Sequence, residues 1–134
     1  MNNFIFEYWQ GICDGSILVG SWIRLLYGLI IERIEDGTYT FSQKKANNAI
    51  RFIEKYCRHN KGKLAPGFLK LDLWQKAFIS VLYGILDKDG YRQFREIILV
   101  IGRKQGKTLL AAAIIAYEAY ADGEFGSEIY CVAP

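Results

Sequence analysis

The sequence has few cysteines, and their spacing suggests neither a disulfide framework nor a metal site. Its 134 residues include three cysteines, Cys13, Cys57 and Cys131, which are far apart and odd in number. No signal peptide is recognisable, so we expect free thiols in a reducing cytoplasm. Cys57 and His59 lie two residues apart, but no second ligand pair accompanies them. That pattern argues against a zinc centre, which usually needs four ligands.

The sequence also lacks a hydrophobic run long enough to cross a membrane, and it has little net charge. The most apolar run, residues 17–31, is 15 residues long and contains Arg24, whereas a membrane-spanning helix needs about 20 apolar residues. We therefore expect a core or interface helix here and no membrane contact. The net charge of +3 says little about nucleic acid. Lys61, Lys63 and Lys70 crowd a predicted loop, which we interpret as a solvated face.

What the sequence does contain is enough apolar material for a packed core. Hydrophobic residues make up 51% of the chain and aromatic residues 15%, which argues against disorder and favours one modest domain. Apolar spacing predicts helices at 4–12, 17–35, 43–58 and 73–86. The second should be buried on more than one side, because it is apolar around most of its circumference. Ser42 is expected to cap the third helix, and Asp72 with Gln75 forms a capping-box pattern at the fourth.

The most informative stretch is an apolar segment followed by a glycine-containing loop and a helix rich in alanine and leucine. Residues 97–101 predict a buried strand, and the loop ends in Gly106-Lys107-Thr108. This is the layout of a P-loop, whose usual pattern is G-x-x-x-x-G-K-[ST]. The first glycine of that pattern should fall at position 101, which is Ile101 here, with Gly102 beside it. We keep the interpretation because the flanking strand and helix fit. The alternative is a basic turn that binds nothing.

The chemistry of this loop suits a triphosphate. Small residues allow backbone N–H groups to turn toward phosphate oxygens, and the N-terminus of the following helix adds about half a positive charge. Lys107 would reach the β- and γ-phosphates as a point charge. The Thr108 hydroxyl would ligate Mg²⁺. The predicted cofactors are therefore ATP and Mg²⁺. The predicted nucleotide-binding residues of the loop are Gly102, Arg103, Lys104, Gln105, Gly106, Lys107 and Thr108.

The order of elements predicts an α/β fold, with a helical N-terminal lobe followed by the first βαβ unit of a P-loop NTPase. A second strand is expected at 128–133, and a right-handed crossover would make the two strands parallel. Two strands do not make a stable parallel sheet, so we expect the chain to be one part of a longer protein. After Thr108 there is no apolar strand ending in acidic residues, which an ATPase needs to hold Mg²⁺ and position the attacking water. Glu124 and Glu128 do not follow such a strand.

Several short motifs occur in an order that resembles the N-terminal part of the large terminase subunit of tailed bacteriophages. Leu71-Asp72-Leu73-Trp74-Gln75 precedes Arg103-Lys104-Gln105-Gly106-Lys107-Thr108 by roughly thirty residues. Ile129-Tyr130-Cys131-Val132-Ala133 follows the helix, and Arg51-Phe52-Ile53-Glu54-Lys55-Tyr56 lies upstream. Large terminases are motors that hydrolyse ATP to package viral DNA into procapsids, and they carry a separate nuclease domain. The resemblance covers most of the chain and is weakest before residue 16.

The resemblance implies roles for individual residues. Gln75 would read adenine, since an amide can both donate and accept hydrogen bonds, although its capping role competes for the same side chain. Arg103 would sense the γ-phosphate, and Lys107 would act with it in catalysis. Residues 1–66 would form the helical lobe and 67–134 the start of the ATPase domain. Partners would be ATP, viral double-stranded DNA, the portal protein and the small terminase subunit, in the cytoplasm of a bacterial host.

The sequence leaves more than one possibility open for the activity and the identity of the chain. The family's Walker B acids and nuclease carboxylates lie beyond residue 134, so we expect the chain to bind ATP with little turnover by itself. It would be an isolated fragment, a truncated prophage gene or a split reading frame. A second possibility is another P-loop enzyme, such as a helicase-like ATPase or a small-molecule kinase. A third is a non-catalytic remnant that binds a partner through its helical lobe.

Overall fold

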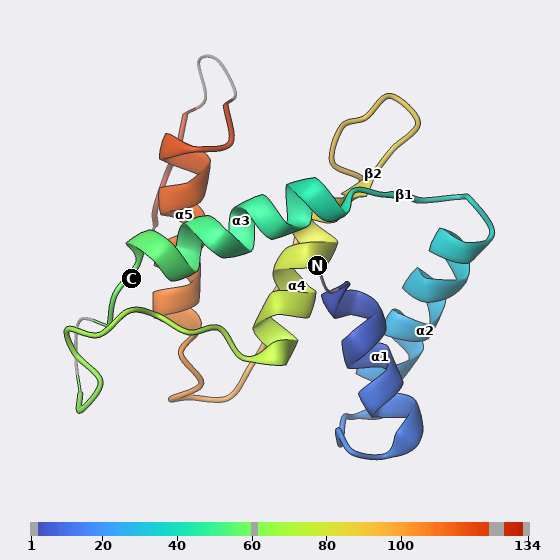
Figure 1. The fold of residues 1–134 in the computed structure, drawn as a ribbon, viewed down its shortest axis with the longest axis horizontal. Helices are drawn as coiled ribbons and strands as arrows, with labels where there is room; N and C mark the ends of the chain where they lie inside the picture. The colour runs from blue at the N-terminus through green and yellow to red at the C-terminus, as the bar shows by residue number, and fades with distance from the viewer. Residues whose placement is uncertain (1–2, 60–61, 124–127, 133–134) are drawn as a thin grey trace. The chain divides into compact units, whose positions relative to one another are not determined.

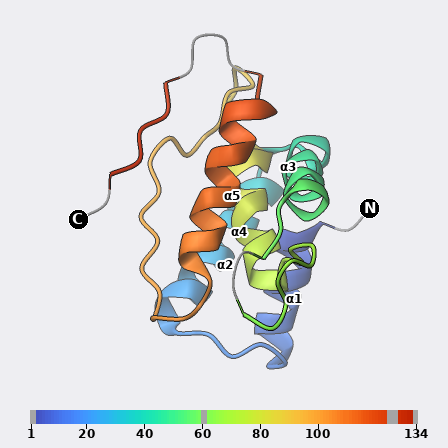
Figure 2. The same ribbon diagram turned by 90° about the vertical axis from the view of Figure 1, so that its left-hand side faces the viewer.

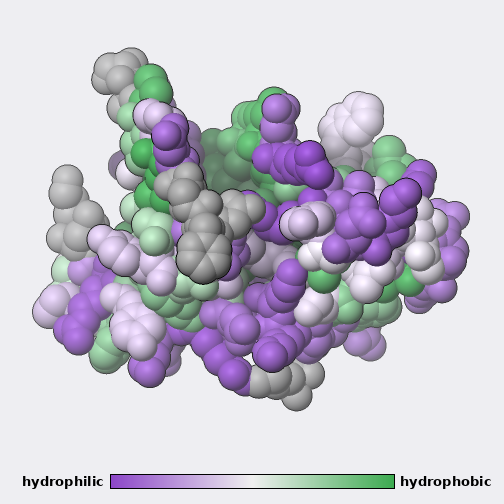
Figure 3. Space-filling model, turned by 90° about the horizontal axis from the view of Figure 1, so that it is seen from above, coloured by the Kyte–Doolittle hydropathy of each residue, from purple (hydrophilic) through white to green (hydrophobic). Residues whose placement is uncertain are grey.

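The computed structural model describes residues 3–59, 62–123 and 128–132, and it is mainly helical (Figure 1). The chain forms two compact units, each of which combines two stretches of sequence. One contains residues 1–50 and 71–97, and the other contains residues 51–70 and 98–134. The units are therefore described separately. Figure 3 shows one face of the molecule, on which hydrophobic and hydrophilic residues are interspersed.

The first helix of the first unit, α1, spans Phe4–Asp14 and confirms the helix predicted at residues 4–12. The Asn3 side chain caps it, since its Oδ1 accepts hydrogen bonds from the backbone N–H groups of Ile5 at 3.1 Å and Phe6 at 3.3 Å. Gly15 ends it in the left-handed conformation, with φ 82°. The break after α1 is thus a common glycine helix stop.

The second helix, α2, spans Ser21–Glu35 and lies beside α1 (Figure 1). It starts at Ser21, four residues after the start of the predicted 17–35 helix, and residues 17–20 are not helical. The expectation that it would be buried on more than one side is wrong within the described residues. One face is buried, whereas the opposite face leaves Trp22 81% and Leu25 64% exposed. A single helix can bury only the stripe that meets a neighbour, and here that stripe consists of Tyr27, Ile30 and Ile31.

The third helix, α3, spans Gln43–Tyr56 and begins at the predicted cap. The Ser42 Oγ accepts a hydrogen bond from the backbone N–H of Lys45 at 3.3 Å. The apolar residues that recur at helical spacing in this segment, Ala46, Ala49, Ile50 and Ile53, are buried. Cys57, which follows the helix, is half-buried. Periodicity in the sequence therefore identified the inward face of this helix correctly.

The fourth helix, α4, spans Leu73–Gly84 and packs against α1. It ends before the predicted residue 86, because β2, Ile85–Leu86, pairs antiparallel with β1, Thr40–Phe41. At Gly84 the end of α4 lies close to Phe41 and Ala46. A Cβ at this position would lie 2.7 Å from the Phe41 ring and 3.0 Å from the Ala46 side chain. A turn follows β2, as is typical of the sequence Asp87-Lys88-Asp89-Gly90, with the backbone N–H of Gly90 donating to the Asp87 carbonyl at 3.1 Å.

The second unit contains α5, Lys107–Tyr120, which confirms the helix predicted behind the loop. The strands predicted at 97–101 and 128–133 are not shown. Residues 97–101 and 128–132 have no strand pairing in the part of the chain that is described, and Figure 2 draws them as plain trace before and after α5. Ile98 is 91% and Val100 is 88% exposed, because a strand becomes buried only when neighbouring strands and covering helices meet it. The parallel βαβ unit thus stays a prediction.

Within the described ranges, helices and one two-stranded antiparallel sheet make up the fold, which is α/β in the broad sense. None of the helices described is long and apolar enough to span a membrane.

Candidate phosphate-binding loop

The loop before α5 is a tight turn with two left-handed residues. Gly106, the N-cap of α5, has φ 74° and ψ 16°, and Lys104 has φ 62°. Glycine adopts this conformation without steric cost. A lysine in it costs about 1–2 kcal/mol, and such backbone outliers concentrate at functional sites. The turn brings the chain into α5 abruptly, as expected for a loop that wraps around a ligand.

The first turn of α5 leaves backbone N–H groups open to a ligand. The first backbone hydrogen bond of the helix runs from the N–H of Leu110 to the carbonyl of Gly106 at 3.0 Å. The N–H groups of Lys107, Thr108 and Leu109 therefore have no carbonyl one turn earlier to bind. Gly106 provides no side-chain cap. Open N–H groups at a helix N-terminus are a favourable environment for an anion.

The charge of this segment is entirely positive. Arg103, Lys104 and Lys107 lie in or next to the turn, and no acidic residue occurs between Glu96 and Glu118. All seven residues predicted to bind the phosphates, 102–108, are exposed. Their side chains are therefore free to move toward a bound anion. The structure thus brings the predicted loop residues together in one basic, solvent-accessible turn.

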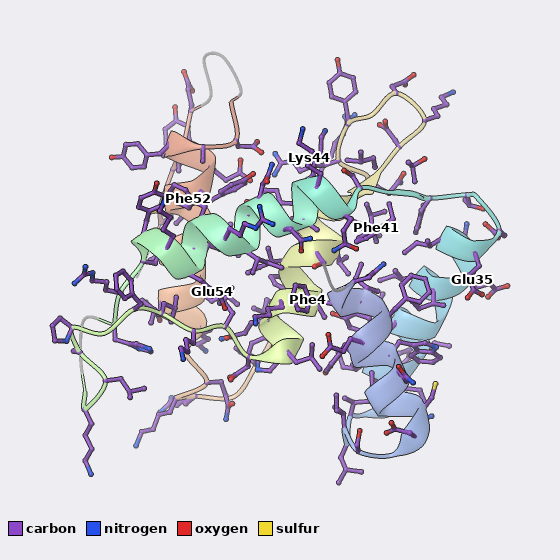
Figure 4. All side chains as sticks on the ribbon, viewed as in Figure 1. Phe4, Glu35, Phe41, Lys44, Phe52 and Glu54 are labelled. Carbon is purple, nitrogen blue, oxygen red and sulfur yellow. The ribbon has the colours of Figure 1, made fainter. Side chains whose placement is uncertain are left out.

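Helix α5 packs through an apolar face and through contact with Phe52, whose role was not predicted from the sequence. Leu110, Ala113 and Tyr117 are buried. The Phe52 ring packs edge-on against the Tyr117 ring, with the centroids 5.5 Å apart, and Figure 4 shows Phe52 on α3. Phe52 also lies against Tyr56, with 5.1 Å between the ring centroids. The signal in the sequence was this aromatic pair at i, i+4 spacing, which is typical of a packed helix face.

Gln75 occupies the third position of α4 and lies in the other compact unit. Its Oε1 accepts a hydrogen bond from the backbone N–H of Asp72 at 2.9 Å, and the residue is 8% exposed. The capping box predicted from the sequence is therefore confirmed. An amide oxygen has two lone pairs, so this bond leaves one acceptor position in addition to the amide donors. The adenine contact of Gln75 stays a prediction.

The remaining chemistry-bearing residues form no second centre in the part of the chain that is described. Cys13, Cys57 and Cys131 are free thiols, and burial raises the pKa of the Cys57 thiol. No group of histidine, cysteine, aspartate and glutamate residues within the described ranges could hold a metal ion. The loop before α5 is thus the best-formed candidate site.

Comparison with known proteins finds one family that resembles the C-terminal part of the chain. Residues 73–134 match the family described as terminase large subunit, ATPase domain. The match begins at the first residue of α4 and includes Gln75, the loop at 102–108 and α5. No curated protein and no solved structure matched the chain. Over residues 73–134, therefore, the chain is similar to the ATPase domain of terminase large subunits.

Proposed function

We propose that residues 102–108 bind the phosphates of ATP, and that the chain is the ATP-binding N-terminal part of a motor that packages viral DNA. The observation that carries the proposal is the loop geometry inside the matched region: left-handed residues at 104 and 106 lead into an uncapped helix N-terminus. A triphosphate fits this donor set, because open N–H groups and three nearby cations complement its negative charge.

Each side chain of the loop has a proposed role. Lys107 neutralises the β- and γ-phosphates, and the Thr108 hydroxyl is one ligand of Mg²⁺, with phosphate oxygens and water supplying the others. Arg103 pairs with the γ-phosphate through its planar guanidinium. Gly102, Gln105 and the strained Lys104 shape the turn, so that backbone N–H groups are directed at the phosphates. Bound Mg·ATP supplies the phosphoryl group of the motor reaction.

The base and the wider assembly are part of the same proposal. Gln75 hydrogen-bonds the adenine, using its amide donors and its second acceptor position. The ATPase domain starts near residue 67, and the helical lobe at residues 1–66 precedes it. In the packaging machine the partners would be viral double-stranded DNA, the portal protein and the small terminase subunit.

The experiment is calorimetry of the chain with ATP, with and without Mg²⁺, together with a phosphate-release assay. We expect weak Mg·ATP binding and little turnover, because phosphate ligands are present while no apolar strand with terminal acids follows Thr108. The control is Lys107→Ala, which removes the phosphate contact and should weaken the binding. Absence of ATP binding by the folded chain would contradict the proposal. Steady hydrolysis would contradict its account of turnover.

A second candidate function is association through the helical lobe, and the exposed face of α2 favours it. Trp22, Leu25, Leu26 and Leu29 recur at i, i+3, i+4 and i+7 and are 44% to 81% exposed. Scattered apolar residues need no explanation, but a contiguous stripe of this kind often marks an interface. A second copy of the chain is the simplest occupant, because such a stripe pairs with itself across a two-fold axis.

Light scattering over a range of concentrations tests the second candidate. We expect a dimer whose dissociation is promoted by Trp22→Ser with Leu26→Ser. The matched control, Tyr91→Ser with Leu64→Ser, also removes exposed apolar side chains but lies outside α2. A wild-type chain that stays monomeric up to high micromolar concentration would eliminate this function.

A further inference from the structure

The exposed apolar stripe of α2 continues into an acidic residue at its C-terminal end. Trp22, Leu25 and Leu29 recur at i, i+3 and i+7, and they are 81%, 64% and 44% exposed. Glu32 follows at i+10 and is also exposed. Side chains at this spacing lie on one face of a helix. A partner that covers the apolar part of the stripe would therefore also lie next to the Glu32 carboxylate.

The opposite face of α2 is fixed against α1. The Tyr27 ring lies edge-on to the Tyr8 ring, with 5.0 Å between the ring centroids. The Arg24 guanidinium donates a hydrogen bond from Nη2 to the carbonyl of Ile12 at 3.1 Å. These contacts hold the stripe in one orientation, and a surface that is already ordered loses less conformational entropy when it docks.

Within the described residues, no side chain caps the N-terminus of α2. Gly20 is the N-cap, and the first turn contains no acidic residue. The first backbone hydrogen bond of the helix runs from the N–H of Arg24 to the carbonyl of Gly20 at 3.2 Å. The N–H groups of residues 21–23 therefore have no carbonyl one turn earlier to bind. A carboxylate from outside the helix would be stabilised at this end.

The C-terminal end of α2 carries carboxylates that its own dipole disfavours. Glu32 and Glu35 are exposed in the last turn, and Figure 4 labels Glu35 there. Arg33 is the basic residue of this turn, and its guanidinium carbon lies 5.8 Å from the centroid of the Tyr39 ring. Negative charge is stabilised at a helix N-terminus and destabilised at a C-terminus. Both carboxylates thus lie at the end of α2 that does not favour them.

We propose that α2 docks antiparallel onto α2 of a second copy of the chain, with Trp22 of each copy against Leu29 of the other. An isologous interface pairs residue i with residue j, and residue j with residue i. The apolar stripe is centred between residues 25 and 26, so a two-fold axis there brings residue 22 opposite residue 29. The apolar side chains of the two stripes then cover one another and leave water.

The same axis brings the acidic end of each helix to the uncapped end of the other. Residue 32 lies opposite residue 19, which immediately precedes the Gly20 N-cap. The Glu32 carboxylate of each copy thus comes close to the open N–H groups of the other, where negative charge is stabilised. A parallel pair would instead place Glu32 beside Glu32 and one positive N-terminus beside the other, which is unfavourable. The charges of α2 therefore select the antiparallel direction.

This arrangement rests on the association proposed above for α2, and it adds the direction of pairing and a dependence on charge. It uses no residue of the loop at 102–108, so it is independent of ATP binding. Residues 22–29 span about two turns of helix. The contact therefore belongs to the small interfaces, which bury less than about 1,200 Å² in total, and we expect a weak dimer.

The test is disulfide trapping at positions that meet only in the antiparallel pair. The natural cysteines are first replaced, as Cys13→Ser, Cys57→Ala and Cys131→Ser, and light scattering checks that this background still associates. Trp22→Cys and Leu29→Cys are then introduced separately and mixed before oxidation. In the mixed dimer the new cysteines face each other, while the opposite edge keeps its Trp22–Leu29 contact. Circular dichroism should show both variants folded.

We expect severalfold more covalent dimer in the mixture than in either variant alone at the same total concentration. In the antiparallel pair two copies of position 22 lie about 10 Å apart along the helix axis, whereas a disulfide needs Cα atoms within about 7 Å. Self-linking of Trp22→Cys to the same extent as the mixture would overturn the direction and leave the association intact. Association without a disulfide in the mixture would also overturn the arrangement. A chain that stays monomeric would contradict both the arrangement and the association.

A charge variant tests the contact between Glu32 and the partner N-terminus. Glu32→Gln should weaken the dimer by about threefold to thirtyfold, because two such contacts are lost per dimer. The matched control is Glu96→Gln, which changes the charge equally at an exposed position of the same unit outside α2. It should leave the dissociation constant from light scattering nearly unchanged. Equal effects of the two substitutions would overturn the electrostatic selection of the antiparallel direction.

Discussion

The Asp72 backbone N–H donates to the Gln75 Oε1 at 2.9 Å, so the residue proposed to read adenine also stabilises the start of α4. Two roles for one side chain can be separated by choosing the substitution. Glutamate at position 75 keeps an acceptor for the Asp72 N–H, since Glu and Gln both serve in a capping box. It removes the amide donors that adenine would need.

We therefore predict that Gln75→Glu keeps the acceptor of the cap and lowers the preference for ATP over GTP. The loss should be about 1 kcal/mol, the net value of one hydrogen bond. Gln75→Ala should lose the same preference and also lower the free energy of unfolding by about 0.5–2 kcal/mol, the usual value of a cap. Calorimetry with both nucleotides and thermal unfolding measure the two effects. An unchanged ATP/GTP ratio in both variants would leave Gln75 with its capping role alone.

The second prediction concerns Lys107 and Arg103, which we expect to act on different states of the nucleotide. Lys107→Ala should weaken ADP and ATP binding alike, because its charge meets the phosphates of both. Arg103→Ala should leave ADP affinity nearly intact, weaken ATP binding, and slow hydrolysis in an assembly that turns over, where charge develops on the γ-phosphate. Titrations with ADP and ATP beside single-turnover hydrolysis decide this. Equal ATP and ADP effects of Arg103→Ala, with an unchanged rate constant, would reduce Arg103 to a solvated cation.

A third prediction uses the two glycines of the loop as a matched pair. Gly106 has φ 74°, so alanine there should be strained by about 1–2 kcal/mol. A Cβ on Gly102 would meet only the Gln105 side chain at 3.9 Å, which is ordinary contact. Gly106→Ala should thus lower thermal stability and ATP affinity together, whereas Gly102→Ala should preserve stability. If both substitutions were equally tolerated, the left-handed start of α5 would not be required.

A fourth prediction concerns alkaline pH and Tyr27, which lies edge-on to Tyr8 with 5.0 Å between the ring centroids. Burial, with a smaller effect from Tyr8, raises the pKa of Tyr27 well above its usual value. The unfolded state loses this proton near pH 10, while the folded state keeps it. Stability is therefore fully present below pH 10 and falls above it, by up to about 1.4 kcal/mol per pH unit.

Urea unfolding between about pH 8 and pH 11 measures this loss. Tyr27→Phe should remove much of the alkaline dependence, because phenylalanine has no proton to retain. Tyr91→Phe, at a position 67% exposed, is the control and should keep the dependence. Parallel behaviour of the two variants would assign the alkaline loss to other groups.

Local sequence signals predicted the local structure well. The caps at Ser42 and Asp72 depend on residues close together in the chain, and the structure confirms them. The loop residues 102–108 were located by the glycine and lysine pattern, and their compact basic turn follows from the left-handed positions within it. The terminase resemblance, drawn from motif order, is confirmed over residues 73–134.

What depended on distant contacts could not be predicted in the same way. The composition of α2 indicated burial all round, but only tertiary packing decided that Tyr27 and Ile30 face inward while Trp22 faces solvent. Helix α4 stops at Gly84 because Phe41, more than forty residues away, pairs with Ile85. The apolar pattern at 97–101 identified a segment that is able to form a strand. Whether it pairs depends on neighbouring strands, because a β-strand satisfies its backbone hydrogen bonds only through another strand, whereas a helix satisfies them within itself.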